Sequence, residues 1–225
     1  MKNLENDHPK IQSLILSSSS RAVLSAGLDL TELYSPDPLR LPMFWNSFQQ
    51  LFLDLYGSRF AVIGAIEGHA PAAGCMLAMA CDYRIMASST INGKPPITIG
   101  LNESKFGIAA PPWLAQLMIR TIGFRKAERA LSIGTLFTPE EALSIGLVDE
   151  VVPTKDVMEK CLLEAMNWAM IPSQTRFASK MLARKKYLDE LVANREKDTE
   201  HFCSFIQNDI VQARLGAYLE SLKRK

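Results

Sequence analysis

One stretch of the chain restricts the fold more than any other, residues 60–87, which read FAVIGAIEGHAPAAGCMLAMACDYRIMA. Its apolar, β-branched start predicts a strand, and the small residues that follow predict a tight turn opening into a helix. Residues 83–87 predict a second strand. A strand, a helix and a strand in this order form a βαβ-like unit. The sequence therefore predicts an α/β fold.

The flanking segments predict further elements of the same kind. Residues 11–17, IQSLILS, are short, apolar and β-rich, and the serine run after them predicts that a strand ends there. Residues 41–57 carry apolar side chains at helical spacing and end at Gly57, a common helix stop.

Beyond Trp113 the pattern is mostly helical. Thr138 and Glu141 have the spacing of a capping box, and residues 148–152, VDEVV, predict a lone strand before the C-terminal helices. No flexible linker interrupts the chain. We therefore expect a core over residues 1–153 and a C-terminal helical region over residues 154–225.

Composition excludes several classes of protein. The chain has 225 residues, 48% of them hydrophobic, which suffices for one substantial core. A net charge of +1 gives no overall field for nucleic acid or an anionic membrane, and no apolar run reaches the ~18 residues of a membrane span. The first ten residues resemble neither a transit peptide nor a signal peptide. Nucleic-acid binding and membrane insertion are not expected.

The cysteines and histidines give no sign of a metal site. The four cysteines form no CxxC pair, and the three histidines lack metal-ligand spacing. Buried, reduced thiols are the expected state.

Two segments place small residues where strands end, SAGLDL at residues 25–30 and APAAGC at residues 70–75. Backbone N–H groups at a turn that opens a helix have no intrahelical partner, and two of them aimed at one oxygen form an oxyanion hole. Acyl thioester chemistry requires such a device. Taken singly, each segment is more often a tight turn packed against its neighbours.

Glu103 lies in IGLNESKFGI, an apolar stretch bounded by glycines. A carboxyl group among such neighbours tends to have a raised pKa, which suits a proton carrier near neutral pH. A solvated loop glutamate, or a charge at a helix N-terminus, explains the residue equally well.

The remaining polar candidates favour structural roles. His69 beside its turn is typical of a hydrogen-bonded structural histidine, and Asp82 and Asp149 are typical of turn or capping positions. Lys180 and residues 184–186 form a basic helix face that is expected to be solvated, with phosphate capture as the alternative.

Taken in order, these segments resemble one family over nearly the whole chain. The segments are, in order, SAGLDLTE, APAAGCMLAMACDYRIMA, IGLNESKFGI, ERALSIGTLFTPEEALSIGLVDEVVP and SFIQNDIVQARLGAYLESLKR. Together they resemble the crotonase, or enoyl-CoA hydratase/isomerase, superfamily. Within it the chain most resembles the mitochondrial Delta3,Delta2-enoyl-CoA isomerases. The resemblance implies a stack of ββα units with C-terminal helices that mediate a homotrimer, and a location in the mitochondrial matrix.

The resemblance also implies roles for particular residues. Glu103 falls on the general acid/base, and the amides of Leu28 and Ala73 fall on the two oxyanion donors. Asn102 falls on a substrate-contacting position. The main chain that lines the path of the CoA thioester comprises Ala26, Gly27, Leu28, Asp29 and Leu30. The substrate partner is an acyl-CoA thioester, and the family needs neither a metal nor a redox cofactor.

The implied reaction moves the double bond of a 3-enoyl-CoA to give trans-2-enoyl-CoA, a step in the β-oxidation of unsaturated fatty acids. Hydratases of the family use a second glutamate, where this chain has Met76. A thioether cannot deprotonate water, so isomerisation by one carboxylate is favoured over hydration.

Three features depart from the family pattern. Ala73 stands where glycine is usual, residues 91–96 resemble an insertion, and the start of the chain resembles the end of the family's first helix. We therefore expect an N-terminally truncated core that lacks the first strands and most of the first helix. Two alternatives follow: a catalytically impaired isoform that acts as a binding or oligomer partner, or another crotonase-type reaction such as thioester hydrolysis.

Overall fold

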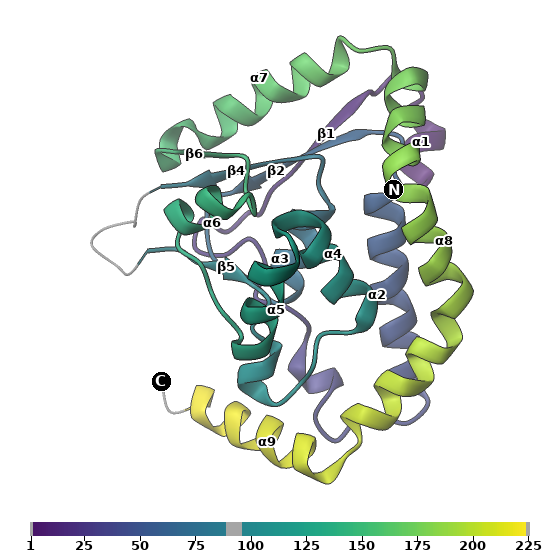
Figure 1. Ribbon diagram of the computed structural model, residues 1–225, viewed down its shortest axis with the longest axis vertical. Coiled ribbons are helices and arrows are strands. Elements are labelled where there is room, and N and C mark those ends of the chain that lie inside the picture. Colours follow the sequence, from purple (N-terminus) through teal and green to yellow (C-terminus); the bar gives the residue numbers. More distant parts are fainter. Residues whose placement is uncertain (1, 89–95, 224–225) are drawn as a thin grey trace.

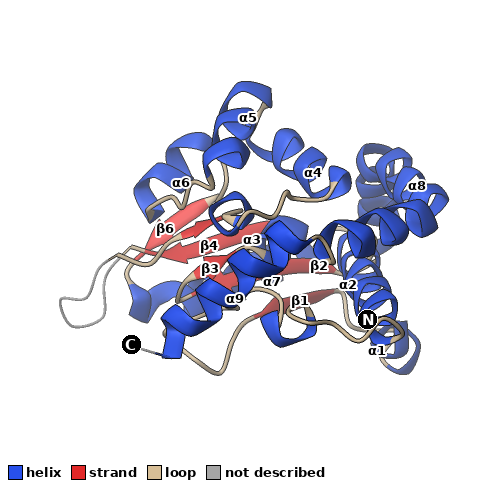
Figure 2. Ribbon diagram, turned by 90° about the horizontal axis from the view of Figure 1, so that it is seen from below, coloured by secondary structure: helices blue, strands red, loops and turns tan. Residues whose placement is uncertain are grey.

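A four-stranded sheet organises the molecule, shown in Figure 1 as a computed structural model that describes residues 2–88 and 96–223. Its order is β1 (Ser13–Leu16), β2 (Ala61–Ile66), β4 (Tyr83–Ala87) and β6 (Glu150–Val152), and every neighbouring pair is parallel. All six residues of β2 are buried. Strands buried on both faces are typical of parallel sheets covered by helices, as Figure 2 shows.

Helices cover the two faces of the sheet. In Figure 1, α7 (Val157–Ala169) lies above it, and α3 (Ala73–Ala80), α4 (Pro112–Ile122), α5 (Phe124–Ile133) and α6 (Pro139–Ile145) lie below. Contacts of α7 with β1, β2 and β4 bury Cys161 and Val157 completely. This burial of α7 on the sheet joins the predicted C-terminal region directly to the core.

A second, two-stranded sheet brings distant segments together. Strand β3 (Ala70–Pro71) pairs in parallel with β5 (Ile99–Gly100), and the amide of Ala72 donates to the carbonyl of Gly100 at 2.8 Å. The small-residue turn after β3 and the segment that carries Glu103 after β5 are therefore neighbours.

The longest helix, α8 (Ser173–Ile206), runs beside α2 (Arg40–Tyr56) and leads into α9 (Asp209–Lys223) at the bottom of Figure 1. Aromatic residues of α2 fill the interface, and both Trp45 and Phe52 are almost fully buried. The shorter elements are α1 (Lys2–Asp7), η1 (Leu30–Glu32), η2 (Glu103–Phe106) and η3 (Thr154–Asp156).

Most predicted elements are present. The strand at residues 83–87 and the helix ending before Gly57 are confirmed, and both hydrogen bonds of the Thr138–Glu141 capping box form. Strand β1 spans four residues, fewer than the seven expected, and lies at the edge of its sheet. The proposed insertion at residues 91–96 lies outside the described residues except for Pro96. The boundary at residue 153 stays a prediction.

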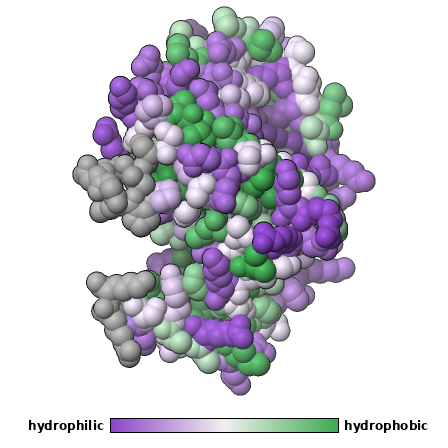
Figure 3. Space-filling model, turned by 60° about the vertical axis from the view of Figure 1, so that its left-hand side comes forward, coloured by the Kyte–Doolittle hydropathy of each residue, from purple (hydrophilic) through white to green (hydrophobic). Residues whose placement is uncertain are grey.

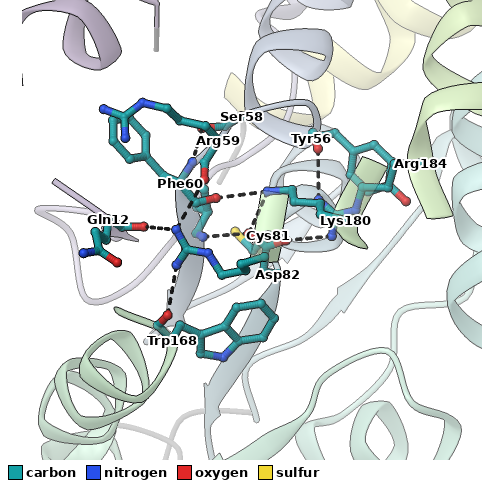
Figure 4. A network of polar contacts seen from close by, with 12 residues as sticks. Gln12, Tyr56, Ser58, Arg59, Phe60, Cys81, Asp82, Trp168, Lys180 and Arg184 are labelled. Carbon is teal, nitrogen blue, oxygen red and sulfur yellow. Dashed lines mark hydrogen bonds and ion pairs between the residues drawn. The ribbon is translucent and has the colours of Figure 1, made fainter. Parts of the chain in front are cut away.

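The expectation of a solvated basic face on α8 is wrong for its first members (Figure 4). Lys180 and Arg184 pair with the buried Asp82 at 2.8 and 2.9 Å, and their side chains are only 7% and 15% exposed. Lys180 also donates to the carbonyl of Phe60, and Arg184 to that of Tyr56. These side chains hold α8 against the start of the sheet, whereas Lys185 and Lys186 are exposed.

The surface mixes polar and apolar side chains. On the face in Figure 3 the two kinds are interspersed, and a notch separates the main body from the lowest part of the molecule, where α9 lies. Some large apolar side chains are nevertheless exposed, such as Leu182, whose exposed fraction is 91%, and Met170, whose exposed fraction is 76%. Among the described helices, none has both the length and the apolar content needed to cross a membrane.

Candidate functional site

One apolar pocket of about 130 Å³ collects nearly all the predicted site residues. Its lining comes from the segment after β1, from η2 and the turn before α3, and from helices α2, α4, α8 and α9. The lining residues are Ala26, Gly27, Leu28, Leu30, Leu33, Trp45, Phe48, Pro71, Ala72, Ala73, Asn102, Glu103, Phe106, Ile108, Ala109, Pro111, Leu114, Phe202 and Tyr218. We call this cavity the Glu103 pocket.

The two predicted turns touch each other in this pocket. A Cβ atom built on Gly27 would lie 3.2 Å from the Cβ of Ala72 and 3.9 Å from the amide nitrogen of Ala73. One built on Gly74 would lie 2.5 Å from the carbonyl oxygen of Ser25, closer than packing allows. Glycine is therefore required at position 74 for the two backbones to approach, and at position 27 it is favoured by the backbone φ of 107°.

The local backbone leaves the two predicted donors unused. Ala73 is the first residue of α3, so its N–H has no acceptor within the helix. Among the hydrogen bonds between described residues, none comes from the amide of Leu28. The positive φ of the small-residue turn, 51°, falls on Ala72 and not on Ala73. A positive φ at an alanine is a strained backbone conformation, so the backbone at Ala72 is strained, and such strain clusters at functional sites.

Glu103 is the one carboxylate among the described residues that line the pocket. It is the first residue of η2, and its backbone carbonyl accepts a hydrogen bond from the amide of Ile108 at 3.1 Å. Burial raises the pKa of the Glu103 carboxyl to about 7, and a hydrogen bond from its own backbone offsets part of this effect. The carboxyl is therefore poised to accept and release a proton near neutral pH.

The raised pKa of Glu103 predicts a pH-dependent stability. The folded chain holds the Glu103 proton up to about pH 7, whereas the unfolded chain releases it near pH 4.5. This tighter proton binding contributes fully to the free energy of unfolding below pH 4.5, and the contribution is lost as the pH rises to 7. Glu103→Gln mimics the protonated form, so it should be more stable than the wild type at pH 8 by up to about 3 kcal/mol and nearly equal at pH 4.5. Denaturant unfolding of both proteins at the two pH values measures the difference, and an equal difference at both would contradict it.

The other predicted residues take different positions. Asn102 lines the pocket and is 8% exposed, with no partner for its side-chain oxygen among the described residues. Leu30 also lines the pocket. Asp29 does not, because its carboxylate turns to Thr31 and accepts from both the backbone amide and the hydroxyl of that residue.

Sequence reasoning missed the aromatic part of the lining. Trp45 and Phe48 lie in a segment assigned only to a helix face, and Phe202 and Tyr218 come from the C-terminal helices. Tyr218 packs against Phe106 of η2 with ring centroids 4.3 Å apart. The available signal was the final phrase SFIQNDIVQARLGAYLESLKR, which contains Tyr218 and begins two residues after Phe202.

The pocket offers little other reactive chemistry. Met76 is fully buried and is absent from the lining, and no group of three or more potential ligands among the described residues is placed to hold a metal ion. Cys75, Cys81 and Cys161 are fully buried, and burial raises the pKa of each thiol.

Comparison with known proteins identifies the family. The profile described as Enoyl-CoA hydratase/isomerase matches residues 1–225. The chain belongs to the enoyl-CoA hydratase/isomerase family. Within this family it is 46% identical to the mitochondrial enoyl-CoA delta isomerase 1 of Mus musculus, over 100% of the chain and 76% of the mouse protein.

Solved structures of the family share the fold. The crystal structure of human mitochondrial delta3-delta2-enoyl-CoA isomerase superposes with a TM-score of 0.94 at 43% identity, covering 99% of this chain and 84% of the human one. The enoyl-CoA hydratase of Bacillus halodurans gives a TM-score of 0.83 at 26% identity, covering 96% and 85%.

Proposed function

We propose that this protein is an enoyl-CoA isomerase that converts a 3-enoyl-CoA into a trans-2-enoyl-CoA, the reaction used in the β-oxidation of unsaturated fatty acids. The observation that carries the proposal is a single carboxylate with a pKa near 7 in an apolar pocket that two touching turns also line. The similarity to enoyl-CoA delta isomerases of mouse and human supports it.

The first step removes a proton from C2. Glu103, as carboxylate, takes this proton, and the electrons of the C2–H bond move toward the thioester carbonyl. The carbonyl oxygen becomes an enolate, which the amides of Leu28 and Ala73 stabilise. Donors fixed in advance at a developing negative charge typically contribute roughly 10² to 10³ in rate each.

The second step returns the proton at C4. The enolate electrons re-form the carbonyl, a double bond forms between C2 and C3, and the former C3–C4 double bond takes the proton from the Glu103 acid. The residue is then a carboxylate again, so no separate cofactor is needed. Asn102 supports the substrate beside this carboxyl.

The alternatives fit the lining less well. Hydration requires a second carboxylate, and the side chain of Met76 is buried away from the pocket. Thioester hydrolysis through an acyl-enzyme requires a nucleophilic side chain such as serine or cysteine, and the described lining contains neither. The assay described in the next paragraph distinguishes isomerisation from a non-catalytic role as a binding or oligomer partner.

Purified protein incubated with 3-enoyl-CoA thioesters of several lengths tests the proposal. Conjugation of the product raises its ultraviolet absorbance, so isomerisation is followed directly. We expect conversion to trans-2-enoyl-CoA and no gain of water in the product's mass. Binding of acyl-CoA without conversion at any length would overturn the proposal in favour of the non-catalytic role.

Two further properties are proposed from the relatives. The names of the mouse, rat and human relatives place those proteins in mitochondria, and we propose the same compartment here. The homotrimer implied by the family is likewise a proposal. Light scattering of the purified protein tests it, since a monomer mass at micromolar concentration would contradict it.

A further inference from the structure

A second cavity lies next to the Glu103 pocket. Neighbouring residues of α8, and of the start of α4, line one space and then the other. On α8, Phe202 lines the Glu103 pocket while the preceding residue, His201, lines the second cavity. At α4, Leu114 lines the first and Trp113 the second. We call the second space the rear cavity. It opens to the surface, and its lining comprises the buried Trp113, Tyr187 and Leu191, the half-buried Asp198, and the exposed Pro112, Gln116, Glu190, Asn194, Lys197 and His201.

Aromatic rings from three helices form the partition, which we call the aromatic wall and which consists of Trp45, Trp113 and Phe202. The ring centroids of Trp45 and Phe202 lie 3.4 Å apart with an interplanar angle of 8°. Trp113 lies 6.4 Å from Trp45 in a tilted arrangement. All three are buried, and the two that line the Glu103 pocket, Trp45 and Phe202, pack against each other.

One carboxylate oxygen fixes this wall. Oδ2 of Asp198 accepts hydrogen bonds from the Trp45 indole at 2.9 Å, from the Trp113 indole at 3.2 Å and from the Gln49 amide at 2.7 Å. Asp198 lies one helical turn before Phe202 on α8. The residue that anchors both indoles therefore belongs to the helix that supplies the third ring.

The difference in size between the two spaces means that the position of the aromatic wall affects the length of acyl chain that fits. The rear cavity measures about 390 Å³, against about 130 Å³ for the Glu103 pocket. An acyl chain that enters past Glu103 meets the aromatic rings before it reaches the larger space. Each additional buried methylene group changes affinity roughly fourfold, so the position of such a wall determines which chain length binds best.

We propose that Phe202, stacked on Trp45 and backed by Asp198, sets the upper length of the acyl chain. This inference rests on the proposed function in one respect, that the ligand is a linear acyl-CoA thioester. Removal of the Phe202 ring opens the Glu103 pocket toward the rear cavity. The apolar parts of Tyr187 and Leu191 there then receive the end of a longer chain.

Calorimetric titration of Phe202→Ala with saturated acyl-CoAs from butanoyl to hexadecanoyl tests the inference. Affinity in the wild type should stop rising at an intermediate length, and in the variant it should continue to rise over at least two more methylene groups. The ratio of long-chain to short-chain affinity should increase about tenfold or more. Phe124→Ala, at an exposed position on α5, is the matched control and should leave the ratio unchanged.

Phe202→Leu, which keeps an apolar side chain and protects against loss of fold, should give an intermediate ratio. An unchanged ratio in both variants, or an equal change at every chain length, would overturn the inference. The titration needs no turnover, so an absence of isomerase activity would refute the proposed function and leave this test intact.

Discussion

Replacing Glu103 by glutamine is expected to lower the kcat of isomerisation by roughly 10³- to 10⁴-fold. The amide keeps the shape of the side chain and its hydrogen bonding but can neither take the C2 proton nor deliver one at C4. Glu103 serves both steps, and the described lining contains no other carboxylate that could replace it. The decrease is measured from the rate at which the conjugated thioester forms.

Binding separates this effect from a loss of fold. Since the amide introduced by Glu103→Gln occupies the same space as the carboxyl, the affinity for a saturated acyl-CoA should change by no more than a few-fold. Glu140→Gln, on the exposed first turn of α6, is the matched control and should retain full activity. A Glu103→Gln variant with more than a tenth of the wild-type rate would show that another group carries the proton.

Asp82→Ala should cause the largest loss of stability, about 3–5 kcal/mol. The substitution leaves Lys180 and Arg184 buried without their carboxylate, and it removes the acceptor of the Val62 amide at the β2 strand. Urea unfolding near pH 7 measures the change, which should appear as a lower midpoint with an unchanged slope.

The same helix provides the control for this prediction. Lys185 and Asp189 form a 2.6 Å ion pair whose side chains are 68% and 61% exposed. Exposed pairs of this kind contribute at most about 1 kcal/mol, so Asp189→Ala should have little effect. If the two variants lose equal stability, the burial of Asp82 contributes nothing.

Local patterns in the sequence predicted those parts of the fold that local physics determines. The strand at residues 83–87, the stop at Gly57 and the Thr138–Glu141 capping box depend on side chains a few positions apart. The two turns and Glu103 were also found, because small residues and an isolated carboxylate stand out in an apolar sequence. That they form one site was implied only by the family resemblance, and the pairing of β3 and β5 shows how the turn after β3 comes to lie beside Glu103.

Contacts between distant segments escaped prediction. Lys180 and Arg184 have the same spacing as a solvated basic face, and two of their acceptors are backbone carbonyls, which leave no trace in a sequence. The stacking of Trp45 on Phe202 joins two helices far apart in the chain and likewise has no local signal. Periodicity indicates which face of a helix is apolar, not which cavity that face closes.

The fully buried thiols make the opening of the core measurable without any engineered probe. Burial raises the pKa of Cys81 and Cys161 to about 12, so neither reacts as a thiolate while the core stays closed. An alkylating reagent therefore marks these buried thiols only when a layer separates: Cys161 when α7 lifts from the sheet, and Cys75 when α3 separates from α2 and α4. Half-buried Cys203, near the aromatic wall, should be marked first. The order of labelling would then rank the layers of the molecule by how often they part.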